Sequence, residues 1–166
     1  MEDLFLAWTR LDGRDGHTVG RQLLAELWQR HGTGPMPPIF TTPRGKPYFA
    51  SGTLHFSISH TKDHVFCCLS PRPVGIDAEE AHRTLSEKLA QRFLSPSEQL
   101  RREAAPDKDL ALLRLWILKE ARAKATGAGI GYRMRETDFS PEDPRIREID
   151  GCLLAVWAED ARPGAD

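Results

Sequence analysis

Long apolar runs, cysteines at metal-binding spacing and an excess of charge of one sign are all missing from this chain of 166 residues. No apolar segment approaches the roughly 20 residues that span a bilayer, so we expect no membrane partner. The first residues are acidic and soon polar, unlike a signal peptide. A net charge of −1 offers no general attraction for nucleic acid, which is therefore not expected as a partner.

Cysteine is scarce, with Cys67 and Cys68 adjacent and Cys152 far along the chain. An odd number of cysteines without CxxC spacing favours reduced thiols, and we therefore expect a cytoplasmic protein. The composition, 40% hydrophobic and 28% charged, is that of an ordinary globular domain. With this length, it predicts a single compact unit over residues 1–166 that ends in a frayed tail at 161–166.

Both halves of the chain show the same order of patterns: a strand, a helix and then a β-hairpin. The repeat suggests a duplicated architecture with its divide near Pro73, although the halves share no visible sequence identity. Capping boxes at Thr84–Glu87 and Ser95–Glu98 predict two helix starts. We expect strands at 4–8, 54–59, 65–70, 75–79, 145–149 and 152–158, and helices at 18–30, 84–93, 95–104 and 110–126.

The segment Gly75–Glu79 carries two carboxylates at strand spacing. Because strand side chains alternate, Gly75, Asp77 and Glu79 share one face, and we expect the glycine to leave room for a ligand beside the acids. Taken alone, such a pair is more often a solvated edge of a sheet.

A second charged group lies in the helical pattern at 110–126, where Glu120 and Lys124 are four residues apart and share a face. The helix is apolar around most of its circumference, which argues for burial, and buried charges need partners. Three carboxylates and a lysine can bind a divalent cation and a phosphate together. A plain ion pair remains the alternative, and for Lys119 structural pairing is as well supported as catalysis.

Five short motifs occur in a compatible order over residues 45–131, and together they are far more specific than any one of them. They resemble the 4′-phosphopantetheinyl transferases, in particular the pseudo-dimeric type that activates carrier proteins. The motifs are Gly45-Lys-Pro47, Phe56-Ser-Ile-Ser-His60, Gly75-Ile-Asp-Ala-Glu79, Arg92-Phe-Leu-Ser-Pro-Ser-Glu98, and Trp116-x-x-Lys-Glu-Ala121 with Lys124.

The resemblance implies an α+β fold of two pseudo-symmetric lobes, about 1–73 and 74–160, each a small antiparallel sheet packed on a long helix. It implies a Mg²⁺-dependent transfer of 4′-phosphopantetheine from coenzyme A to a serine of an apo acyl or peptidyl carrier protein, releasing 3′,5′-ADP. Mn²⁺ is the alternative metal, and a monomer is expected. The arginine-bearing segment 83–102 is a candidate surface for the acidic carrier.

The resemblance also assigns roles to residues. Those matching Asp77, Glu79 and Glu120 hold the metal on the pyrophosphate, and Asp77, Glu120 and Lys124 are the candidate catalytic residues. The lysine matching Lys124 contacts the pyrophosphate, the histidine matching His60 helps to bind the 3′-phosphate, and the lysine matching Lys46 lines the nucleotide pocket. The remaining candidates for coenzyme A binding are Arg44, Ser59 and Lys119.

Other functions stay open at this point. A metal-dependent phosphodiesterase or nuclease also uses acids and a lysine around Mg²⁺, although such sites usually place the acid-x-lysine element on a strand. A catalytically silent protein that binds coenzyme A or a carrier domain is a further alternative. Zinc at His60 and His64 is disfavoured because no third ligand accompanies them.

Overall fold

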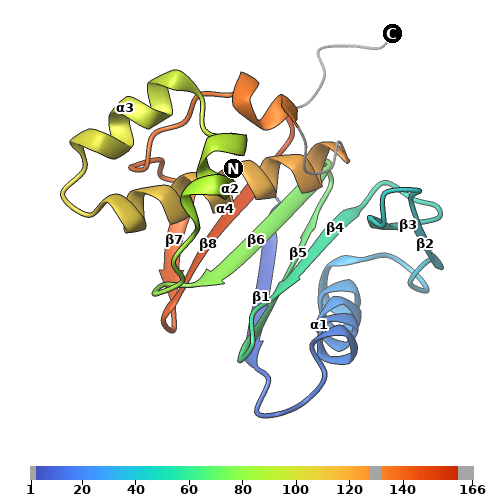
Figure 1. Cartoon of the computed structure of the whole chain (residues 1–166). Coiled ribbons are helices and arrows are strands. Elements are labelled where there is room, and N and C mark those ends of the chain that lie inside the picture. Colours follow the sequence, from blue (N-terminus) through green and yellow to red (C-terminus); the bar gives the residue numbers. More distant parts are fainter. Residues whose placement is uncertain (1–2, 128–131, 161–166) are drawn as a thin grey trace, which may run out of the picture.

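The computed structural model describes residues 3–127 and 132–160 and confirms an α+β fold (Figure 1). Two three-stranded antiparallel sheets each pack on a long helix, in the order β1-β5-β4 and β6-β8-β7. We call the elements up to β5 the N-terminal lobe and those from β6 onward the C-terminal lobe. Among the described residues, no helix is long and apolar enough to span a membrane.

The N-terminal lobe packs helix α1 on one face of its sheet. Alternation along β5 directs Val65, Cys67 and Leu69 into the core beneath the helix. Asp15 caps α1, because its carboxylate accepts the N–H of Thr18. The elements are β1 Phe5–Arg10, α1 Gly16–His31, β2 Ile39–Thr41, β3 Pro47–Phe49, β4 His55–His60 and β5 His64–Ser70, with β2 and β3 forming a separate hairpin.

The C-terminal lobe packs helix α4 on its sheet and surrounds the helix with further segments. Helix α3 lies against α4, and the core of this lobe includes residues from α2, from the connection between α2 and α3, and from the 3₁₀ helix η1. Asp107 caps α4, and Gly127 ends it in the left-handed conformation. The elements are β6 Val74–Glu80, α2 Glu87–Phe93, α3 Pro96–Ala104, α4 Lys108–Thr126, η1 Tyr132–Glu136, β7 Ile146–Ile149 and β8 Cys152–Ala158.

The two sheets share a third core, formed by the strand faces that point away from the helices. Phe66 and Cys68 of β5 pack there with Ile76 of β6 and Leu154 of β8. Strand β6 pairs with β8 on one side only, and serine hydroxyls satisfy two N–H groups on its other edge. Ser57 Oγ of β4 accepts from Ile76 N at 3.0 Å, and Ser59 Oγ accepts from Ala78 N at 3.1 Å.

A charged cluster joins the lobes at another point. Asp150, in the turn between β7 and β8, accepts two hydrogen bonds from Arg10 at 2.7 and 2.9 Å and lies 2.7 Å from His64 Nε2. Because Arg10 and His64 belong to the N-terminal lobe, Asp150 links the two sheets. The turn itself is the predicted one, since Asp150 and Gly151 both have positive φ.

Two predicted helix starts have different outcomes. The capping box at Ser95 is confirmed, with both reciprocal hydrogen bonds to Glu98 in place. The box predicted at Thr84 is wrong: α2 begins after Ser86, whose side chain accepts the N–H of Leu89 at 3.1 Å. Both residues are good caps, and the two positions differ by less than one turn, so local preference does not separate them. The predicted tail at 161–166 lies outside the described residues.

Candidate active site in the cleft between the lobes

Helix α4 lies directly on strand β6 because Gly75 has no side chain. A Cβ atom at this position would lie 2.0 Å from the carbonyl oxygen of Ala121 and 2.5 Å from the backbone nitrogen of Ala125. The prediction that Gly75 leaves room for a ligand is therefore wrong, since the helix backbone fills this space. The close approach has a consequence for the acids that follow it on the same strand face.

Asp77 lies on the same face of β6 as Gly75, beneath helix α4. Glu120 belongs to that helix. Each of these two residues is only 7% exposed. Burial, followed by the repulsion of Glu120 from Asp77, raises the pKa of Glu120 to about 7. Burial also raises the pKa of Asp77 to about 6, against the attraction of Lys124. The charge of Glu79 raises both pKa values further, so the three carboxylates form one electrostatic group.

Two cations of the chain itself contact this acidic group. Lys124 Nζ donates to Asp77 Oδ1 at 3.1 Å and to the carbonyl oxygen of Ile76 at 3.0 Å. Arg83 Nη1 donates to Glu79 Oε1. The plain ion pair between Glu120 and Lys124 that the spacing left as an alternative is not what forms among the described residues, because Lys124 pairs with Asp77 on the neighbouring strand.

The carboxylate oxygens of the acidic group are ligands of the kind that a hard divalent cation prefers. Asp77 Oδ2 is buried and has no hydrogen-bond partner among the described residues, so this oxygen fits a metal ligand. Within residues 3–127 and 132–160, however, no three His, Cys, Asp or Glu side chains are already arranged around a common ion position. Because Glu79 is turned to Arg83, assembly of all three acids requires a side-chain movement.

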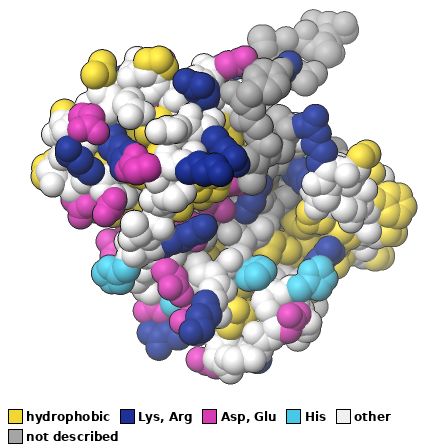
Figure 2. All heavy atoms as spheres, in the orientation of Figure 1, with side chains coloured by type: hydrophobic (Ala, Val, Ile, Leu, Met, Phe, Trp, Pro, Cys, Tyr) yellow, Lys and Arg dark blue, Asp and Glu magenta, His cyan; other side chains and the backbone are white. Residues whose placement is uncertain are grey.

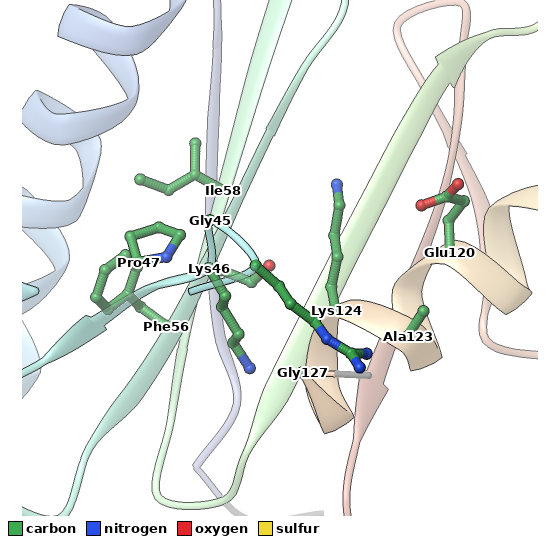
Figure 3. Close-up of a pocket in the computed structure, with 11 residues that line it drawn as sticks. Gly45, Lys46, Pro47, Phe56, Ile58, Glu120, Ala123, Lys124 and Gly127 are labelled. Carbon is green, nitrogen blue, oxygen red and sulfur yellow. The ribbon is translucent and has the colours of Figure 1, made fainter. Parts of the chain in front are cut away.

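A cleft of about 410 Å³ lies beside the acids, between the two lobes. Figure 3 shows Lys46 entering from the N-terminal lobe and Lys124 and Glu120 from α4. Lys46 Nζ donates to the carbonyl oxygen of Ala125 at 3.2 Å, and burial lowers the pKa of Lys46. Figure 2 shows basic side chains on both sides of the hollow between the lobes. The cleft is lined by Arg44, Gly45, Lys46, Pro47, Phe56, Ser57, Ile58, Glu120, Ala123, Lys124 and Gly127.

The structure thus brings together most of the predicted site residues. Arg44, Lys46, Glu120 and Lys124 line the cleft, and Asp77 joins them through its bond to Lys124. Glu79, which is paired with Arg83, does not line the cleft itself. Ser59, His60 and Lys119 are likewise not among the described lining residues.

Lys119 belongs to a buried structural pair and not to the cleft. Its ammonium contacts Glu98 Oε1, with both side chains fully buried, and also donates to the carbonyl oxygens of Phe93, Met134 and Thr137. Every proton of the ammonium is engaged, so none is left for coenzyme A. We therefore withdraw Lys119 from the coenzyme A ligands, in favour of the structural alternative.

The other two residues have different surroundings. Ser59 uses its hydroxyl to bind the backbone of β6, as described above, which indicates a structural role between the lobes. His60 is exposed at the end of β4 and lies against the first turn of α1, where a Cβ on Gly16 would lie 2.9 Å from its ring. His60 therefore stays a prediction for the 3′-phosphate, at the edge of the N-terminal lobe.

Sequence reasoning missed the contact between Arg83 and Glu79, and it placed Arg83 on the carrier surface instead. The four-residue spacing of the two was visible, but the segment after β6 is not helical, so the spacing carried no signal. Ser57 was also missed as a cleft residue, although its motif was recognised.

Comparisons with known proteins agree with this geometry. The family model described as the 4′-phosphopantetheinyl transferase superfamily matches residues 73–156. A 4′-phosphopantetheinyl transferase of Bacillus pumilus is 36% identical over 122 residues, which cover 70% of this chain and 50% of that protein. One from Nostoc sp. is 37% identical over 135 residues, 68% of this chain and 56% of that protein. One from Escherichia coli O157:H7 is 34% identical over 119 residues, 69% and 58% of the two chains. The chain thus spans about half the length of these relatives.

Proposed function

Because the family model covers just over half of it, the chain belongs to the 4′-phosphopantetheinyl transferase superfamily, and we propose that it carries out the reaction of that family. In this proposal it transfers 4′-phosphopantetheine from coenzyme A to a serine of an apo acyl or peptidyl carrier protein and releases 3′,5′-ADP. The observation that carries the proposal is a cleft lined by Lys46 of the N-terminal lobe and by Glu120 and Lys124 of α4, in which Lys124 is bonded to Asp77 of β6.

The cations of the cleft suit the negative charge of coenzyme A. Lys46 and Lys124 approach from opposite lobes, so a pyrophosphate between them would be held from both sides. In the described structure Lys46 donates to a backbone carbonyl, a weaker partner than a phosphate oxygen, and can exchange it when the substrate enters. Lys124 donates to the carbonyl oxygen of Ile76 and to the Asp77 carboxylate, and it can turn to the phosphate as the metal takes over Asp77.

Asp77, Glu79 and Glu120 are the proposed ligands of Mg²⁺, with Mn²⁺ as the alternative. When bound, the ion neutralises charge that builds on the leaving diphosphate. The carrier serine must lose a proton as its oxygen attacks phosphorus, and Glu120 is the proposed acceptor. Its position suits this role, because the Glu120 carboxylate lines the cleft in which the substrate is proposed to bind.

The carrier is proposed to approach the C-terminal lobe, but over fewer basic residues than the sequence suggested. Arg102 is buried and paired with Glu87, and Arg101 donates to the carbonyl oxygen of Phe139. Arg83 is paired with Glu79. Within the described part of the chain, Lys88 and Arg92 of α2 are the basic residues of segment 83–102 that are exposed and whose side chains make no hydrogen bond or ion pair. Replacing both with glutamate tests the surface: the KM for an acidic carrier rises, and the KM for coenzyme A does not.

A mass measurement tests the function itself. The protein is incubated with coenzyme A, Mg²⁺ and an apo acyl or peptidyl carrier domain, and the carrier is then weighed. We expect it to gain one phosphopantetheine group, whereas a carrier with alanine at the acceptor serine gains nothing. Coenzyme A binding without transfer to any carrier would identify a silent binder, and Mg²⁺-dependent cleavage of a plasmid would identify a phosphodiesterase. Either result would contradict the proposal.

A further inference from the structure

Two of the three proposed metal ligands are already paired with cations of the chain, Asp77 with Lys124 and Glu79 with Arg83. The guanidinium of Arg83 donates to Glu79 Oε1, and this carboxylate is largely screened from solvent. The positive charge of Arg83 also acts on the two neighbouring acids, Asp77 and Glu120, where it favours the ionised forms. Arg83 thus supplies, from outside the cleft, part of the positive charge that a metal ion would bring.

Of the two basic side chains that contact the acids, Arg83 is held more loosely than Lys124. Its side chain is 47% exposed, and within the described part of the chain it makes a single side-chain hydrogen bond, to Glu79. Its position comes from a turn after β6, in which its backbone N–H donates to the carbonyl oxygen of Glu80 at 2.9 Å. Lys124, which lines the cleft, instead makes two hydrogen bonds to β6.

A divalent cation and the guanidinium need the same oxygen. Mg²⁺ and Mn²⁺ bind carboxylate oxygens at short range, and a carboxylate turned toward an arginine has to be released first. The release costs little on the side of Arg83, because about half of its side chain is already exposed and it can move into solvent. The cation takes its place at Glu79, so the largely buried carboxylate is not left without a partner.

We propose that Arg83 competes with the divalent cation for Glu79 and thereby sets the cation concentration at which the site fills. This inference rests on the proposed function, because it takes Glu79 to be a metal ligand. It assigns to Arg83 a role in metal affinity and not in the chemical step. The role belongs to this particular residue, so a general loss of positive charge elsewhere on the lobe does not reproduce it.

Binding of Mn²⁺ to the whole chain, measured by electron paramagnetic resonance without coenzyme A or carrier, tests the proposal. Arg83→Gln should bind Mn²⁺ about two- to fivefold more tightly than the unmodified protein, the range expected for an exposed ion pair. The gain should shrink as salt is added, because salt already weakens the pair in the unmodified protein. Arg92→Gln is the matched control, since Arg92 is an exposed arginine on the same lobe, and it should bind like the unmodified protein.

A second background separates competition from simple repulsion. In a Glu79→Gln protein there is no carboxylate for Arg83 to hold, so adding Arg83→Gln should bring no further gain in affinity. A gain that persists in this background, an equal gain in Arg92→Gln, or no gain in Arg83→Gln alone would overturn the proposal and leave the metal site standing. If the unmodified protein binds no Mn²⁺, the metal site of the proposed function fails, and this inference fails with it.

Discussion

The two lobes share an order of elements. They differ in the side chains that the first strand of each lobe presents to its long helix. In the N-terminal lobe, the positions of β1 that face α1 are apolar, with Phe5 and Ala7 packed on the core. In the C-terminal lobe, the corresponding edge strand β6 presents Gly75 and Asp77 to α4. The same scaffold therefore carries an ordinary core on one side and an acidic group on the other.

The difference shows why the pKa of an acid in the C-terminal lobe is raised. The buried residues of α1 are glycine or apolar, and its other side faces solvent. Helix α4 is covered by α3 and η1 as well as by the sheet, so its polar residues Lys119 and Glu120 are buried too. Covering the helix removes water from Glu120, and this loss of solvation is the main reason that its pKa rises.

The largest effect is expected from removing the charge of Glu120. Glu120→Gln keeps the shape of the side chain, but it cannot accept the serine proton, so kcat should fall by at least about a hundredfold. Coenzyme A should still bind at raised Mg²⁺. The matched control is Glu26→Gln, a glutamate on the exposed side of α1, which should leave kcat unchanged. Near-normal turnover of Glu120→Gln in saturating Mg²⁺ would remove both roles proposed for this residue.

The next effect concerns the buried pair of Lys119 on α4 and Glu98, which has no counterpart on α1 in the described structure. Lys119→Met leaves the carboxylate of Glu98 buried without its cation, which should lower the free energy of unfolding by about 3–5 kcal/mol in urea titrations. Adding Glu98→Gln should recover part of the loss, because the uncompensated charge is then gone. If Lys119→Met were as stable as the unmodified protein, the pair would not be needed to hold α3 and α4 together.

Substitutions at two glycines test how tightly each long helix packs on its sheet. Gly75→Ala forces a methyl group against the backbone of α4 and should cost about 3 kcal/mol of unfolding free energy. Gly20→Ala on α1 places its methyl group 2.8 Å from Cγ2 of Ile58, so a side chain and not a backbone has to move. The gain in helix propensity of up to about 1 kcal/mol offsets part of this cost, so the net loss should be smaller than for Gly75→Ala. Equal losses in thermal or urea unfolding would show that both contacts are equally rigid.

The smallest effect is a pH dependence of the stability of the metal-free protein. The pKa values of Asp77, about 6, and Glu120, about 7, lie above those of an unfolded chain. The folded protein therefore keeps these protons longer, and its stability falls as pH rises from about 4 to 7. Glu120→Gln should raise the free energy of unfolding at pH 8 by on the order of 1–2 kcal/mol, seen as a higher Tm, and change both little at pH 4. A Tm difference that did not grow with pH would contradict the buried, repelling acids.

Local patterns in the sequence were sufficient for most of the elements. Capping at Ser95, the turn at Asp150-Gly151 and the end of the long helix at Thr126 all depend on residues within a few positions of one another. The motifs likewise identified the acids of β6 and α4 and the two cleft lysines. These features are readable because the interactions that decide them are short in sequence.

Partners that lie far apart in the chain were decided only by the tertiary structure. The sequence alone determined that Gly75, Lys119 and Ser59 were special positions, but it did not determine what each of them faces. Packing decided that Gly75 admits a helix, that Lys119 binds Glu98, and that Ser59 binds the backbone of β6. The physical reason is that a buried polar group takes whichever partner the fold brings within hydrogen-bond distance, and sequence spacing does not encode that distance.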